Sequence, residues 1–227
     1  MCAVVGAFIK NATAEDFDML QRVFFESKIR GMHATGISYV KGGKVITEKH
    51  PLPANQFPFN FKEYVNEDGN LYLIGHCRYS TSDLEYNQPM ATDTKSIVHN
   101  GVISQELPEN WEKLYGYKCM TKNDSELILY SDNPLEEFAE MSMGVCELNA
   151  NKSMRVYRNG KRPLYLTSME NGCIITSTSD IAKRANVDGS CAEILMNTYL
   201  TFDEHFAMVV RTVTIPNSKD LQQYEVC

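Results

Sequence analysis

The chain has 227 residues, of which 43% are hydrophobic and 22% charged, the usage of an ordinary globular protein. Its formal net charge of −7, without a basic cluster, argues against a nucleic-acid partner. No apolar run is long enough for a membrane span, and the start lacks a signal-peptide pattern. Seven cysteines without a C-x-x-C pair argue against a disulfide framework and a zinc site. They fit a reducing cytoplasm, which would be the host's if the chain is viral.

The first half of the chain predicts strands with one long helix. The apolar, β-branched run "AVVGAFI" at 3–9 predicts a buried strand. Residues 15–29 have helical periodicity, with Thr13 as the expected N-cap and Phe17, Leu20 and Phe24 on one face. Further strands are expected at 36–40 and 44–48, joined by a Gly42-Gly43 hairpin turn, and at 71–80 and 96–103.

The second half predicts two helices and several strands. "NDSELILYS" at 123–131 predicts a helix with Asn123 as N-cap and Glu126 in the capping-box position. Strands broken by Asn-Gly turns are expected over 143–178, a capped helix over 177–185 and a last strand over 206–215. Without linkers or repeats, we expect one α+β domain over 1–227, ending in a short polar tail at 216–227.

Cys2 can be interpreted in two ways. The simpler interpretation is a small apolar residue at the start of a strand. In the other, removal of Met1 makes Cys2 the first residue, so that its thiol lies beside its own α-amine. A free thiol is only a few per cent thiolate at neutral pH and needs a base, which a neutral amine can supply. While Met1 remains, that nitrogen is an amide and is not basic.

Further polar residues follow predicted strands or start a helix. Arg78, Thr81 and Ser82 lie in the loop into which the strand segment at 71–80 runs, Asn100-Gly101 ends the next strand, and Asp124 starts a helix. Taken singly, each has a plainer explanation: a surface ion pair, a turn, or a charge favoured by the helix dipole. Only the set, in this order and together with Cys2, indicates a site.

The motifs of this set extend over most of the chain. In order they are "MCAVVGAF" (1–8), "RGMHATGI" (30–37), "GHCRYST" (75–81), "NQPM" (87–90), "VHNGVI" (98–103), "NDSEL" (123–127), "KRPLYL" (161–166) and "STSDIA" (177–182). Over roughly residues 1–217 the chain resembles the class II glutamine amidotransferase domain, an N-terminal-nucleophile hydrolase. It is most similar to the glutaminase domains of amidophosphoribosyltransferase and glucosamine-phosphate synthase. The resemblance implies a four-layer αββα sandwich.

The resemblance also implies roles. Cys2 would attack the side-chain amide of L-glutamine, release ammonia and form a glutamyl thioester that water hydrolyses. The Asn100 side chain and the Gly101 N–H would hold the oxyanion. Arg78 would bind the substrate α-carboxylate and Asp124 its α-ammonium. The substrate loop would also contain Tyr79, which would act in closure, with Thr81 and Ser82. No metal and no organic cofactor are implied.

The chain departs from the family pattern at three positions. Ala3 replaces the usual Gly, His33 replaces the usual Asp, and Ser82 stands where the synthase has His. The histidines at 50, 76 and 205 are expected to be structural, and the other six cysteines to be core or surface thiols.

Two alternatives stay open: hydrolysis of another γ-glutamyl or small acyl amide, and a non-catalytic relic that binds glutamine. We also expect a separate synthase or other ammonia-acceptor protein as partner. The larger family members carry a synthase domain, and the tail at 216–227 is too short to hold one.

Overall fold

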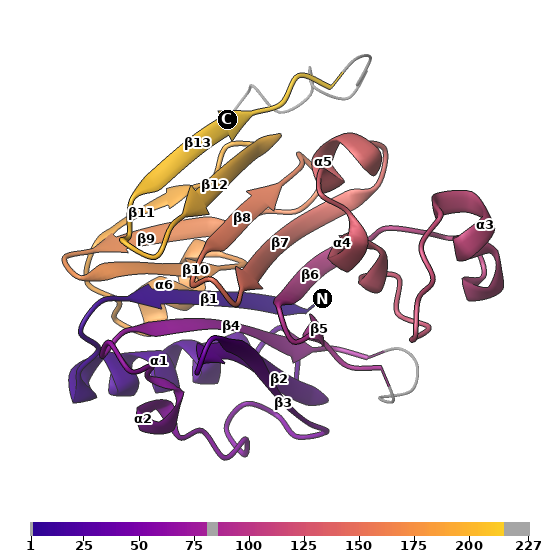
Figure 1. Ribbon diagram of the computed structural model, residues 1–227. Helices are drawn as coiled ribbons and strands as arrows, with labels where there is room; N and C mark the ends of the chain where they lie inside the picture. The colour runs from indigo at the N-terminus through magenta and orange to yellow at the C-terminus, as the bar shows by residue number, and fades with distance from the viewer. Residues whose placement is uncertain (1, 81–85, 216–227) are drawn as a thin grey trace.

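The computed structural model describes residues 2–80 and 86–215, which form two antiparallel sheets packed face to face with helices on both outer sides (Figure 1). The first sheet has the strand order β11-β9-β10-β1-β4-β2-β3 and the second β13-β12-β8-β7-β6-β5. This is the predicted four-layer αββα arrangement.

The first sheet consists of β1 (Ala3–Ile9), β2 (Ala34–Lys41), β3 (Lys44–His50), β4 (Leu71–Arg78), β9 (Tyr165–Met169), β10 (Gly172–Thr176) and β11 (Ser190–Glu193). The second consists of β5 (Met90–Ala91), β6 (Lys95–Val102), β7 (Ser142–Asn149), β8 (Met154–Arg158), β12 (Thr198–Phe202) and β13 (Met208–Thr212). The helices are α1 (Ala14–Ser27), α2 (Phe61–Tyr64), α3 (Trp111–Tyr115), α4 (Glu126–Tyr130), α5 (Pro134–Glu137) and α6 (Ser179–Arg184), with a 3₁₀ turn η1 at Pro108–Asn110.

β1 lies in the middle of the first sheet and is buried on both faces. Because side chains alternate along a strand, Val5 and Ile9 pack under the helices, whereas Val4 and Phe8 pack against the second sheet. The uninterrupted apolar run at 3–9 is therefore the signature of a strand covered on both sides.

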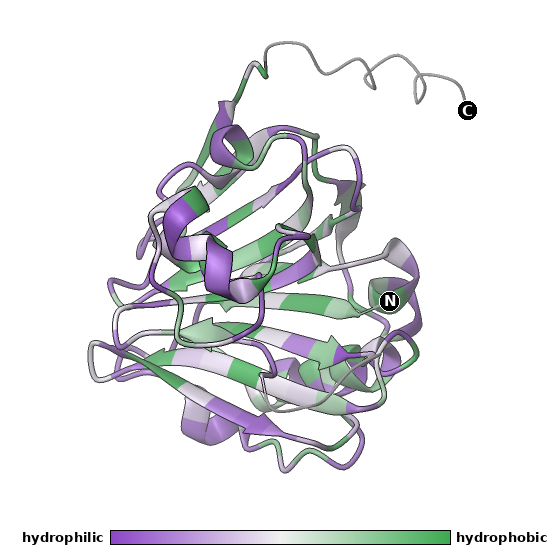
Figure 2. Ribbon diagram, turned by 90° about the vertical axis from the view of Figure 1, so that its right-hand side faces the viewer, coloured by the Kyte–Doolittle hydropathy of each residue, from purple (hydrophilic) through white to green (hydrophobic). Residues whose placement is uncertain are grey.

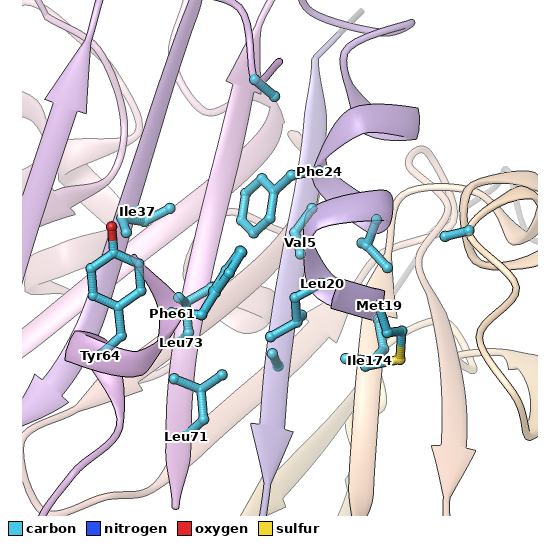
Figure 3. Close-up of a cluster of buried hydrophobic side chains, with 14 of the residues drawn as sticks. Val5, Met19, Leu20, Phe24, Ile37, Phe61, Tyr64, Leu71, Leu73 and Ile174 are labelled. Carbon is cyan, nitrogen blue, oxygen red and sulfur yellow. The ribbon is translucent and has the colours of Figure 1, made fainter. Parts of the chain in front are cut away.

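α1 covers the outer face of the first sheet (Figure 3). Thr13 caps it as predicted, in a capping box completed by Asp16. Leu20 and Phe24 are fully buried against the sheet. Phe24 lies where Gly75 leaves room, since a Cβ at Gly75 would be 2.4 Å from the ring. The helix and strand sequences are thus matched at this contact.

A third core cluster lies between the second sheet and the short helices that cover it. It includes Trp111 of α3, Leu127 of α4, Leu135 of α5 and Val145 of β7. Helices in Figure 2 carry both purple and green segments, as expected for helices with one buried face. The layer of short helices was not predicted beyond α4, because segments of four or five residues are too short to show a helical period.

The predicted capping box of α4 is wrong. α4 begins after Ser125, which makes no side-chain capping bond. Asn123 instead donates from Nδ2 to the carbonyl of Tyr86 (2.9 Å) and accepts at Oδ1 from the Ser125 N–H (3.1 Å). The Glu126 carboxylate accepts from the Thr121 N–H at 2.7 Å. The Asn123 and Glu126 side chains therefore bind backbone groups of the loops before the helix and do not form a capping box.

The end of the chain also differs from expectation. The segment predicted as one strand at 206–215 contains β13 at Met208–Thr212, and its partner β12 was not predicted. α6 lies within the helix predicted over 177–185, but the predicted cap is wrong, because the N-cap residue Thr178 makes no side-chain cap hydrogen bond. Residues 216–227, the predicted polar tail, lie outside the described residues.

No helix within the described ranges is long and apolar enough to cross a membrane. The described cysteines are all free thiols, with Cys77, Cys146 and Cys173 buried. No group of three or more His, Cys, Asp or Glu side chains in residues 2–80 and 86–215 is arranged to hold a metal ion.

Candidate active site

A cavity of about 730 Å³ opens where β1 begins and where β4 and β6 end. Five of the predicted site residues line it together: Cys2, Arg78, Asn100, Gly101 and Asp124. They come from four separate parts of the chain, so the fold assembles what the sequence order only indicated.

Cys2 lies directly before β1, next to the last residues of β4. Its Sγ accepts a hydrogen bond from the Tyr79 N–H (3.4 Å) and lies 3.8 Å from the Tyr79 carbonyl oxygen. The Cys2 carbonyl accepts from Nδ2 of Asn100 and from Nε of Arg30, both at 3.0 Å. The residue is partly exposed to the cavity. Its backbone is thus held by two side chains while its thiol stays accessible.

Asn100 connects the second sheet to the start of the first. Its Nδ2 donates to the Cys2 carbonyl and, at 2.9 Å, to the hydroxyl of Ser177, which also accepts from the Val4 N–H at 2.7 Å. Both amide protons of Asn100 are therefore engaged in this structure. Ser177 was part of a motif but had no predicted role.

Gly101 has backbone angles that favour glycine. Its φ is +145°, and a Cβ at this position would lie 1.8 Å from the Ser142 carbonyl oxygen and 2.6 Å from Nε2 of His99. The first contact is with backbone, which cannot yield cheaply. The close passage of β6 against β7 at this point requires glycine.

Gly101→Ala is therefore expected to destabilise the fold by at least about 2 kcal/mol, from steric overlap with the Ser142 backbone together with strain at positive φ. Urea unfolding of the variant measures this loss. Gly160→Ala is the matched control, because a Cβ there approaches nothing closer than 3.5 Å. Equal stabilities of the two variants would contradict the steric explanation.

Arg78 is the last residue of β4. Its Nη1 donates to the Tyr86 carbonyl (3.0 Å) and to Oδ1 of Asn87 (2.8 Å), which orients the guanidinium along the cavity wall. Tyr79 is half exposed, and its backbone N–H and carbonyl lie beside the thiol. The predicted substrate-loop residues Thr81 and Ser82 lie outside the described residues.

Asp124 lies on the opposite wall, before α4. Its Oδ2 accepts hydrogen bonds from the backbone N–H groups of Ile103 (2.6 Å) and Ser104 (3.1 Å). Oδ1 receives no hydrogen bond from any described residue. One carboxylate oxygen thus fixes the chain after β6, and the other is available to a ligand.

A buried network behind Asn100 was missed by the sequence interpretation. Nε2 of His99 lies 3.1 Å from the Ser142 carbonyl, which can only accept, so Nε2 carries the proton. Nδ1 then accepts from the Ser125 hydroxyl (2.9 Å), and the Gln88 amide donates to the same hydroxyl (3.1 Å). Burial lowers the pKa of His99. This neutral network joins β6 to the start of α4, next to Asp124.

Two further groups in the cavity wall bear on its electrostatics. His76 is fully buried, and burial lowers its pKa to about 3, so it stays neutral. Burial also lowers the pKa of Arg30, the nearby Arg162 guanidinium lowers it further, and Cys2 opposes both effects. Both arginines belong to motifs noted in the sequence. The sequence did not show that they lie close together in the fold.

Comparisons with known proteins give a structural likeness only. No protein-family model matches the sequence, and no curated protein does. Glutamine phosphoribosylpyrophosphate amidotransferase from B. subtilis, solved with ADP and GMP, has a TM-score of 0.69 and 18% identity over 93% of this chain. An allosteric regulatory enzyme of purine biosynthesis has a TM-score of 0.71 and 18% identity over 94%.

The chain spans about half of both those structures, 49% and 50% of their lengths. A glutamine aminotransferase class-II domain protein from Silicibacter pomeroyi has a TM-score of 0.56 and 12% identity, with 93% of this chain and 99% of that one covered. The chain has the fold of these glutamine amidotransferase structures, with two antiparallel sheets packed face to face between two layers of helices.

Proposed function

We propose that the chain is a class II glutamine amidotransferase that hydrolyses L-glutamine to glutamate and ammonia. The observation that supports this best is the single cavity into which Cys2, Asn100, Arg78 and Asp124 converge. It offers a nucleophile, an amide donor, a cation and a carboxylate to a ligand that needs all four.

The thiol of Cys2 is the proposed nucleophile, and its own α-amine, freed by removal of Met1, is the proposed base. The amine takes the thiol proton as sulfur attacks the side-chain amide carbon of glutamine. Collapse of the tetrahedral intermediate breaks the C–N bond. The α-ammonium of Cys2 gives its proton to the leaving nitrogen, which departs as ammonia. Water then attacks the glutamyl thioester, which yields glutamate and restores the thiol. Met1 lies outside the described residues.

Asn100 and Gly101 are the proposed oxyanion donors. Because both amide protons of Asn100 are engaged by Cys2 and Ser177, one of these contacts would be exchanged for the oxyanion when substrate is bound. Such an exchange needs only a small movement, because Nδ2 of Asn100 already lies 3.0 Å from the carbonyl oxygen of Cys2, the proposed nucleophile.

The head group of glutamine is proposed to bind between Arg78 and Asp124. A planar guanidinium matches a carboxylate, and the second oxygen of Asp124 can accept from an ammonium. This pair favours a free amino acid over a simple acyl amide. Assays with glutamine, other γ-glutamyl amides and small acyl amides test the choice, and equal rates on all three would reject it.

The nucleophile is tested by covalent labelling. A diazo-ketone analogue of glutamine should modify Cys2 alone, and intact mass should show an active chain without Met1. Labelling spread over several cysteines, or full activity of a chain that keeps Met1, would reject the proposed chemistry. A protein that binds glutamine without releasing ammonia would be the non-catalytic relic.

Arg78→Lys and Asp124→Asn are expected to raise KM for glutamine roughly 10- to 100-fold, with smaller changes in kcat, because they remove charge-assisted contacts to the head group. Asparagine keeps an acceptor for the N–H groups of Ile103 and Ser104, so the wall stays in place. Steady-state kinetics measure the effect, with Lys113→Gln on exposed α3 as control. A fall in kcat alone would contradict head-group binding.

We also infer that the ammonia is passed to a partner protein that carries the acceptor site. Free ammonia at neutral pH is mostly ammonium, which is a poor nucleophile. The isolated chain should then hydrolyse glutamine slowly. The rate should rise when the partner and its bound acceptor are added. Fast turnover by the isolated chain, together with the failure of a pull-down to find a partner, would instead indicate a stand-alone glutaminase.

A further inference from the structure

The peptide that joins Tyr79 to Ser80 lies beside the thiol and is held from its other side by a histidine. The Ser80 N–H donates to Nδ1 of His33 at 2.9 Å. In a trans peptide the N–H and C=O groups point in opposite directions. The same peptide therefore directs the Tyr79 carbonyl toward Sγ of Cys2, 3.8 Å away.

His33 is itself fixed by its surroundings. Its backbone N–H donates to the Arg78 carbonyl at 3.0 Å, and its ring packs against the Tyr79 ring with centroids 4.9 Å apart. The preceding turn lies against β4 so closely that a Cβ at Gly31 would be 2.1 Å from the Cys77 carbonyl oxygen. The imidazole is exposed, but its Nδ1 has a defined place.

We propose that His33 is a positioning residue for the Cys2 thiol. As an acceptor, Nδ1 holds the peptide in the orientation in which the Tyr79 carbonyl, and not the Ser80 N–H, faces the sulfur. The sulfur thus faces one N–H, that of Tyr79 at 3.4 Å, and one carbonyl. If the Tyr79–Ser80 peptide turned over, the sulfur would face two N–H groups, which stabilise a thiolate. This inference rests on the proposed use of Cys2 as nucleophile, and it identifies the side chain that fixes which backbone groups face the sulfur.

The same assignment accounts for a departure noted in the sequence. Position 33 has histidine where the resemblance leads us to expect aspartate. Either residue can accept a backbone N–H, but histidine does so without placing a negative charge near the sulfur. Histidine at position 33 is thus an acceptor, as aspartate would be, but without the negative charge of aspartate.

Three variants separate the acceptor from the ring. His33→Asn keeps an acceptor near the place of Nδ1 and loses the ring, His33→Phe keeps the ring and loses the acceptor, and His33→Ala loses both. All three substitute an exposed side chain, so the fold is expected to persist. The other charged or titratable groups around the thiol are common to every variant: the α-amine of Cys2 in the proposed mature chain, Arg30, His76, Cys77, Arg78, Tyr79, His99, Asp124 and Arg162.

The experiment measures the rate at which iodoacetamide alkylates Cys2 between pH 7 and 10, by mass spectrometry of its peptide. In His33→Phe and His33→Ala the hydrogen bond that orients the Tyr79–Ser80 peptide is lost. The pH at which alkylation reaches half its maximal rate should therefore fall by up to about one unit. Alkylation at pH 7.5 would then be roughly three- to tenfold faster, and the Asn variant should match the wild type.

A Phe variant that matches the wild type would overturn the proposal in favour of ring packing. An Asn variant that behaves like Ala would overturn it as well. Because iodoacetamide reacts without glutamine, the outcome is independent of turnover. If the alkylation rates follow the expected series but the protein shows no glutaminase activity, the proposed function is rejected and the positioning role of His33 is not.

Discussion

Cys2→Ala is expected to abolish glutamine-dependent ammonia release, by a factor on the order of 10³ or more, because among the described cysteines only Cys2 lines the cavity. Cys77 and Cys173 are buried in the cores, and burial raises the pKa of each to about 12. Cys2 precedes β1 and contributes little to packing, so the unfolding temperature should change by only a few degrees. Ammonia release and thermal unfolding are measured on the same preparation.

Two variants control this experiment. Cys2→Ser retains the shape of the side chain but offers a weaker nucleophile, and should also be strongly impaired. Cys191→Ala removes an exposed thiol of β11 and should leave the rate unchanged. Substantial activity in Cys2→Ala would mean that the cavity works without a thiol nucleophile, and would remove the basis of the proposed function.

Asn100→Ala is expected to lower kcat about 10²- to 10³-fold with a much smaller change in KM. The amide is proposed to stabilise charge that exists only in the transition state, and it also holds the Cys2 carbonyl at 3.0 Å. Steady-state kinetics with glutamine give both parameters. The rate of single-turnover thioester formation shows whether the chemical step is the one affected.

Asn100→Asp is the sharper control, since it keeps the size of the side chain and removes both N–H donors. It should be at least as impaired as Asn100→Ala. Ser177→Ala removes the second partner of the Asn100 amide while leaving its contact to Cys2, and should have a milder effect. An Asn100→Ala enzyme with an unchanged kcat would show that this amide serves only the structure.

Elements with a strong local pattern were predictable. The run at 3–9 contains no polar residue, and it became the central strand β1. Thr13 and the periodic apolar face behind it marked α1, which ends at Ser27, two residues before the expected boundary. In both cases burial follows from residues close together in sequence, which is the information that periodicity carries.

The sequence motifs predicted that the site residues would lie together, but not the contacts that they make. Cys2, Arg78, Asn100, Gly101 and Asp124 were named from motifs and share one cavity. That both protons of Asn100 are engaged could not be seen, because one acceptor is Ser177, 77 residues further along the chain. The network around His99 was missed for the same reason: strand pairing and the approach of α4 create it, and no local pattern encodes them.

The position of β1 has a consequence for biosynthesis. Residue 5 pairs with residue 75 on one side and with residue 176 on the other, so both neighbours of this strand are translated long after it. Until β10 has left the ribosome, β1 is at best half paired, and its beginning is open to the enzymes that trim nascent chains. The completed sheet then encloses the strand. The proposed removal of Met1 would then come before assembly of the proposed active centre, and we expect a truncated product lacking β10 to release no ammonia.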